Sequence, residues 1–111
     1  MAYETKREID EFIVEEKDSY IEVKPKFTLI TPEMEKKLIG FLNTTYFGVK
    51  CDIRLNLSEM KYIPSNTRLV ILDFAKEMKK QSRKFYILGA PKSLVNFLKR
   101  FQLEGIIRLE S

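Results

Sequence analysis

The chain has 111 residues, of which 44% are hydrophobic and 32% charged, with 4 glycines and 4 prolines. This composition excludes collagen-like and low-complexity proteins, and it predicts one domain over residues 1–111 because this length supports a single packed core. The apolar runs are far shorter than the roughly 20 residues of a membrane helix, and the N-terminal sequence lacks an apolar signal core. We therefore expect a cytoplasmic protein that does not insert directly into a membrane.

Two residue counts limit the chemistry of the chain: histidine is absent, and Cys51 is the one cysteine. The absence of histidine removes the commonest general base, the nucleophile pairs that depend on it, and the commonest metal ligand. We therefore expect no enzyme activity, no catalytic residues, no cofactor and no zinc or copper site. Cys51 is interpreted as a small buried thiol at the start of a strand, with a reactive thiol as the alternative.

Two strands and one helix are predicted in the first half of the chain. Apolar residues on either side of Asp18 and Ser19 predict a hairpin of two strands with its turn at these residues. Thr31 is placed to cap the following helix, and Pro32 suits its first position. The residues that recur at helical spacing and predict its buried face are Met34, Leu38, Phe41 and Leu42.

The second half alternates strands and helices. A strand begins at residue 51, with Ile53, Leu55 and Leu57 on its apolar face, and is followed by a helix over residues 65–81. A buried strand over residues 85–90, a helix over residues 91–105 and a last strand over residues 106–111 complete the chain. The residues predicted to form the apolar faces of the two helices are Leu69, Leu72, Phe74 or Ala75, Met78, Leu94, Leu98 and Phe101.

The order β-β-α-β-α-β-α-β predicts an α/β fold. We expect a single-layer mixed β-sheet of about five strands packed by helices, because strand-helix-strand units favour parallel pairing.

Two charged segments have no clear role in catalysis or nucleic-acid binding. The densest basic run, residues 76–84, lies at a predicted helix C-terminus in a chain of net charge +4, where lysines complement the helix dipole. We interpret it as a solvated face, with phosphate binding as the alternative; a nucleic-acid partner is not expected, because aromatic residues are not interleaved on the same face. Acidic residues near the N-terminus lie on exposed strands, which makes catalytic use improbable.

The segment LNLSEMKYIPSNTRLVILDFAKEMKKQSRKFYILGAPKSLVNFLKRFQLEGIIRLE consists of an apolar strand, a short polar loop, a helix, a strand ending near glycine, a second helix and a closing strand. This pattern over residues 51–110 resembles the STAS domain, the family of bacterial anti-sigma factor antagonists and of the cytoplasmic tails of sulfate transporters. The family loop reads Asp-Ser-Ser-Gly-Leu-Gly. Pro64, Ser65 and Asn66 stand at its Asp, its first Ser and its phosphorylated position, while Thr67 and Leu69 stand at its two glycines.

The resemblance implies a non-catalytic regulatory domain that binds a protein partner, an anti-sigma factor of the serine-kinase type or a larger signalling assembly, and so takes part in transcription regulation. The implied partner-binding residues are Pro64, Ser65, Asn66, Thr67 and Arg68. Family members are switched by phosphorylation, but Asn66 has no hydroxyl and is expected to stay unphosphorylated. Ser65 and Thr67 are possible shifted acceptors.

Several alternatives remain open. The chain could instead be a small STAS subunit of a lipid or anion transport complex. Ser65 or Asn66 could simply cap the helix by accepting a hydrogen bond from its first N–H groups. Arg68 could pair with an acidic partner or be solvated. Because STAS chains often carry one more helix after the last strand, an edge or patch left exposed here could support a homo-oligomer.

Overall fold

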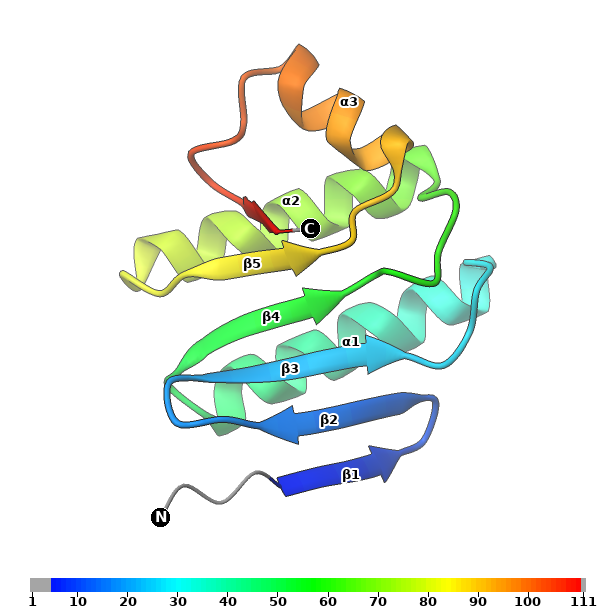
Figure 1. Ribbon diagram of the computed structural model, residues 1–111. Coiled ribbons are helices and arrows are strands. Elements are labelled where there is room, and N and C mark those ends of the chain that lie inside the picture. Colours follow the sequence, from blue (N-terminus) through cyan, green and yellow to red (C-terminus); the bar gives the residue numbers. More distant parts are fainter. Residues whose placement is uncertain (1–4, 111) are drawn as a thin grey trace.

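The computed structural model describes residues 5–110. These residues form six strands and three helices: three strands come first, and helices then alternate with the remaining strands (Figure 1). The elements are β1 (Thr5–Ile9), β2 (Phe12–Glu16), β3 (Tyr20–Pro25), α1 (Pro32–Gly48), β4 (Asp52–Asn56), α2 (Ser65–Lys80), β5 (Phe85–Leu88), α3 (Lys92–Arg100) and β6 (Arg108–Glu110).

The six strands form one mixed sheet in the order β1-β2-β3-β4-β5-β6. The first three pair antiparallel, and β3 to β6 pair parallel. This arrangement confirms the predicted α/β fold with a mixed sheet. The sequence missed β1, because its residues, Thr-Lys-Arg-Glu-Ile, lack the alternation of apolar and polar residues that marks a half-buried strand. Charged residues of this kind are common on edge strands, where they discourage pairing with other chains.

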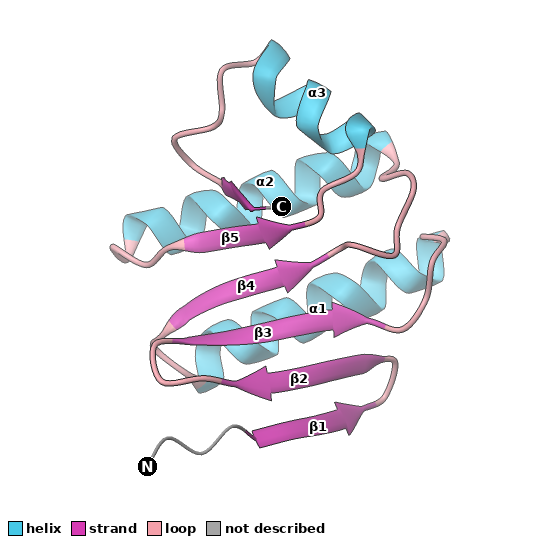
Figure 2. Cartoon of the chain, viewed as in Figure 1, coloured by secondary structure: helices cyan, strands magenta, loops and turns pink. Residues whose placement is uncertain are grey.

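Helices α1 and α2 lie side by side against one face of the sheet, and α3 packs near its β5–β6 end (Figure 2). The core lies between the helices and the sheet. Three of its side chains, Ile53, Leu55 and Leu57, come from one face of β4 and the residue after it, as predicted, and all are at most 1% exposed. Leu38 and Leu42 of α1 are likewise fully buried.

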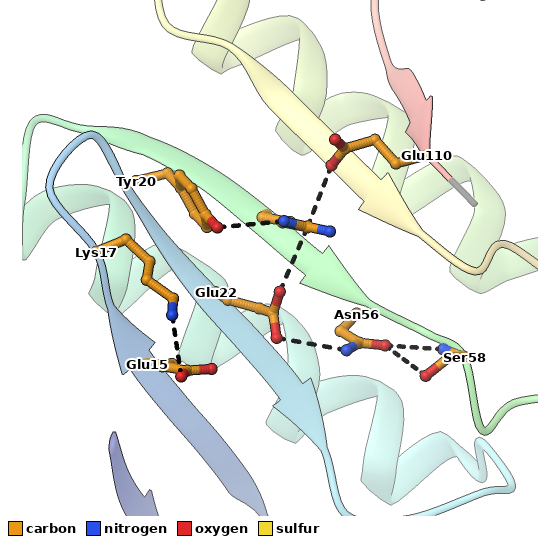
Figure 3. A network of polar contacts seen from close by, with 8 residues as sticks. Glu15, Lys17, Tyr20, Glu22, Asn56, Ser58 and Glu110 are labelled. Atoms are coloured by element: carbon orange, nitrogen blue, oxygen red, sulfur yellow. Dashed lines mark hydrogen bonds and ion pairs between the residues drawn. The ribbon is translucent and has the colours of Figure 1, made fainter. Parts of the chain in front are cut away.

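The face of the sheet that α1 and α2 leave uncovered is polar. Arg54 lies near its centre, with Nε 3.3 Å from Glu22 Oε1 and 3.1 Å from Glu110 Oε1. Its Nη1 donates to the hydroxyl of Tyr20 at 3.2 Å. Figure 3 shows Glu22 on β3 and Glu110 on β6 approaching this point from opposite sides. Arg54 therefore ties the short C-terminal strand to the middle of the sheet.

Two residues that helical spacing placed in the core are exposed instead. Leu69 of α2 is 52% exposed, and Phe101, at the end of α3, is 57% exposed. In α2 the buried stripe passes through Thr67, Ile71 and Met78, which moves Leu69 onto the outer surface. Phe101 is the C-cap residue of α3 and has left helical geometry, so the period no longer applies to it.

Candidate docking corner at the start of helix α2

The loop from β4 to α2 brings the predicted partner-binding residues to the end of the sheet at which β4 and β5 end (Figure 1). Two hydrogen bonds donated by backbone N–H groups hold this loop. The N–H of Leu57 donates to the carbonyl of Leu88 at 2.8 Å, and the N–H of Ile63 donates to Ser93 Oγ of α3 at 2.9 Å. Ile63 itself is fully buried. The loop is therefore anchored to β5 at its beginning and to α3 just before α2 begins.

Pro64 is the N-cap residue of α2, and no side chain accepts a hydrogen bond from the first N–H groups of this helix. The expectation that Ser65 or Asn66 caps α2 is therefore wrong. The extended backbone of Pro64, with φ −59° and ψ 155°, leads into the helix, and its carbonyl accepts the first helical hydrogen bond from Arg68 N–H at 2.9 Å. By contrast, Thr31 caps α1 as predicted, accepting from the N–H of Met34 at 3.2 Å.

Ser65 and Asn66 are exposed, whereas Thr67 is only 1% exposed. The Thr67 hydroxyl donates to Glu35 Oε1 of α1 at 2.6 Å. A buried hydroxyl needs such a partner, and this bond also ties α2 to α1. Of the three polar residues in Ser-Asn-Thr, the first two therefore face solvent and the third faces the interior.

Arg68 is half-buried and held by contacts within the chain. Its Nη2 donates to Ser65 Oγ at 2.7 Å, its Nη1 donates to the carbonyl of Ser93 at 3.3 Å, and its guanidinium lies 5.5 Å from the ring centre of Phe97. Arg68 therefore connects α2 to α3. Its guanidinium makes contacts within the chain and is not simply solvated. A substitution at Arg68 would disturb this packing as well as any contact with a partner.

Sequence reasoning missed two exposed apolar residues beside Ser65 and Asn66. Tyr62 is 56% exposed in the loop, and Leu69 is 52% exposed one turn into the helix. Leu69 could have been found from its sequence position, because it falls outside the stripe of Ile71, Ala75 and Met78. We call residues 62–69 the docking corner. Its solvent-facing part has two apolar side chains around two small polar ones, and the first turn of α2 contains no acidic residue.

Cys51 is half-buried, and burial raises the pKa of its thiol. Because less of the reactive thiolate is present at a given pH, we expect Cys51 to react with iodoacetamide at neutral pH more slowly than a free thiol. Unfolding in urea should abolish the difference. Alkylation of the folded chain at the rate of free cysteine would contradict this prediction.

Within residues 5–110, no group of three or more metal-ligating side chains lies close enough to hold a metal ion. None of the helices in this part of the chain is long and apolar enough to cross a membrane.

Comparison with known proteins identifies the fold. No family model matches the sequence, and no curated protein matches it. The crystal structure of TM1081 from Thermotoga maritima, a protein provisionally assigned as an anti-sigma factor antagonist, is similar with a TM-score of 0.71 and 20% identity over 90% of this chain and 86% of that one. The NMR structure of TM1081 gives a TM-score of 0.69 and 17% identity over 88% and 78% of the two chains. The chain therefore has the same fold as TM1081, which is the STAS-like fold that the sequence predicted.

Proposed function

We propose that this chain is a non-catalytic regulatory domain that binds a protein partner through the docking corner. The observation that carries the proposal is the pair of exposed apolar side chains, Tyr62 and Leu69, which flank a helix start that hydrogen bonds from Ile63 and Arg68 anchor to α3. Exposed apolar groups on a preorganised surface lose little conformational freedom on binding, so they suit a docking site. The structural likeness to TM1081 supports the same role.

The proposed partner is an anti-sigma factor of the serine-kinase type, or a larger signalling assembly. Asn66 is exposed but has no hydroxyl, so this position would not be switched by phosphate. Ser65 is the better candidate for a shifted acceptor, because its hydroxyl is exposed beside Arg68, which could pair with a phosphate. The Thr67 hydroxyl is buried and donates to Glu35, which makes it a poor acceptor in the folded chain.

The docking corner is tested by replacing its apolar side chains. We expect Tyr62→Ser and Leu69→Ser each to weaken partner binding by about 1–3 kcal/mol, since contacts of this kind dominate interface energies. Asn66→Asp should weaken binding by a similar amount, because it places an unpaired charge in the contact. The stability of the Asn66→Asp variant should be unchanged or slightly raised, since a carboxylate is favourable in the first turn of α2, which has no acidic residue.

Isothermal titration calorimetry with a partner isolated by pull-down measures these effects, and thermal melts check folding. Phe47→Ser is the matched control, because Phe47 is an 82% exposed aromatic residue that lies outside the docking corner, at the C-terminal end of α1. It should leave binding unchanged. If all four variants melt normally and bind the partner as tightly as the unaltered chain does, the proposal that the docking corner binds the partner is refuted. The identity of the partner separates the two proposed roles: a serine kinase supports the signalling role, whereas a permease or transport ATPase supports the transport-complex alternative.

A further inference from the structure

A second feature lies at the opposite end of α2 from the docking corner. Helix α2 is ~24 Å long at about 1.5 Å per residue, and its far end meets the start of β5 (Figure 1). A cavity of about 150 Å³ opens there. We call it the basic cavity. The residues that line it are Lys79, Ser82, Arg83, Lys84, Phe85, Gly105, Ile106 and Arg108.

Two segments far apart in the sequence, residues 79–85 and residues 105–108, bring the cations of the basic cavity together. Lys79 belongs to the last turn of α2, Lys84 directly precedes β5, and Arg108 begins β6, where it pairs in register with Tyr86. Ser82, with φ +57°, lies in the turn between α2 and β5. The backbone N–H of Lys84 donates to Asp52 Oδ1 at 2.9 Å. The positions of these cations therefore follow from the fold.

Among residues 5–110, no carboxylate forms an ion pair with the cations of the basic cavity. No carboxylate oxygen in this part of the chain lies within 4.0 Å of a charged nitrogen of Lys79, Arg83, Lys84 or Arg108, and no acidic residue lines the cavity. Elsewhere the surface contains many ion pairs. Those pairs are Arg7–Glu16, Lys17–Glu15, Lys24–Glu59, Lys26–Glu8, Lys37–Glu11, Lys37–Glu33, Arg54–Glu22, Arg54–Glu110 and Lys80–Glu77.

The four cationic side chains differ in how many hydrogen bonds they make within the chain. Arg83 is held by the chain itself: its Nε and Nη2 donate to the carbonyl of Cys51, and its Nη1 donates to the carbonyl of Tyr46. Lys79 Nζ makes one long contact, 3.5 Å to the carbonyl of Gly105. Lys84 and Arg108 have exposed side chains that make no side-chain hydrogen bond or ion pair with residues 5–110. They are free to bind an anion.

We propose that the basic cavity binds a phosphoryl group. A phosphate dianion has several acceptor oxygens and a charge that Lys84 and Arg108 together would balance, with the Ser82 hydroxyl and Lys79 as further donors. The cavity, of about 150 Å³, has room for a phosphoryl group. The bound group belongs either to a small soluble phosphate or to a phosphomonoester lipid headgroup.

The experiment uses the full chain, isotopically labelled, in two parallel arms at low salt. In the first, inorganic phosphate is titrated and backbone amide shifts are followed by NMR. We expect saturable shifts at Ser82, Lys84 and Gly105, and we expect Lys84→Gln and Arg108→Gln each to weaken binding by about tenfold. Raising the ionic strength should weaken binding further. Lys36→Gln is the matched control, since it removes one exposed lysine from α1, away from the cavity.

In the second arm, the chain is sedimented with vesicles of phosphatidylcholine with and without phosphatidic acid. Sedimentation that needs phosphatidic acid, Lys84 and Arg108 would support a lipid headgroup; saturation by phosphate without sedimentation would support a soluble ligand. Absence of saturable shifts, or equal loss of binding in Lys36→Gln, would overturn the proposal. All these substitutions are on exposed side chains, and amide spectra confirm that each variant is folded. The result of this experiment does not depend on whether the docking corner binds a partner, because the basic cavity and the docking corner share no residue.

Discussion

Replacing Thr67 by glutamate is expected to lower the free energy of unfolding by about 3–5 kcal/mol. Thr67 is 1% exposed, and its hydroxyl donates to Glu35 Oε1 at 2.6 Å. A glutamate there replaces a hydrogen-bond donor with a second carboxylate, so two like charges would meet where little water reaches. The loss would take a large part of the roughly 5–15 kcal/mol that stabilises a typical domain. Urea unfolding followed by circular dichroism measures it.

The pH dependence of this variant gives a second readout. Burial and the neighbouring Glu35 should raise the pKa of the introduced carboxyl above that of an unfolded glutamate. A raised pKa means that the folded chain tolerates the protonated form better, so the deficit of Thr67→Glu should shrink as the pH falls toward about 4. A deficit that stays constant from pH 7 to 4 would argue against charge burial as its cause.

Ser65→Glu is the matched control for Thr67→Glu. Ser65 is exposed and lies in a first turn without acidic residues. Its Oγ is 2.7 Å from Arg68 Nη2. We expect its stability to be unchanged or raised by about 0.3–1 kcal/mol, since the added charge favours the helix start. The same contrast applies to phosphate, which Ser65 could carry without unfolding and Thr67 could not. Similar stabilities for the two variants would contradict this distinction.

The sequence predicted most elements of the fold because their patterns are local. Ile53 and Leu55 of β4 alternate cleanly with polar residues, and so does Leu57 directly after it, while Thr31 with Pro32 forms a recognisable helix start. The missing strand was β1, which is charged and pairs on one side only, so its formation depends on β2 rather than on its own residues.

The candidate site was predicted less completely, because its contacts are between elements. Spacing alone could not show that Thr67 faces Glu35, 32 residues earlier in the chain, or that Arg68 reaches Ser93. The assumption that every apolar residue at helical spacing is buried also failed at Leu69, which lies on the surface. Leu69 falls outside the buried stripe of α2, so this error came from the choice of the helical face and not from a contact between elements.

Replacing Gly89 by alanine is expected to destabilise the chain by about 2–4 kcal/mol, combining left-handed backbone strain with overpacking. Gly89 follows β5 with φ +67°, a conformation that glycine adopts readily. A β-carbon added there would lie 2.7 Å from Ser58 Cα and 2.8 Å from Ser58 Cβ. Ser58 cannot easily move away, because its N–H and Oγ both donate to Asn56 Oδ1, at 3.0 and 2.6 Å.

The effect of Gly89→Ala should extend to the docking corner. Gly89 leads into α3, where Ser93 accepts hydrogen bonds from both Ile63 and Arg68, so displacing this turn would loosen the start of α2. We therefore expect Gly89→Ala to lower both the denaturation midpoint and partner binding. Gly40→Ala is the control, because a β-carbon on Gly40 of α1 meets no atom within 4 Å and should stabilise the helix by about 0.5–1 kcal/mol. If Gly89→Ala unfolds at the same urea concentration as the unaltered chain, the close approach of Gly89 to Ser58 is not a constraint on this fold.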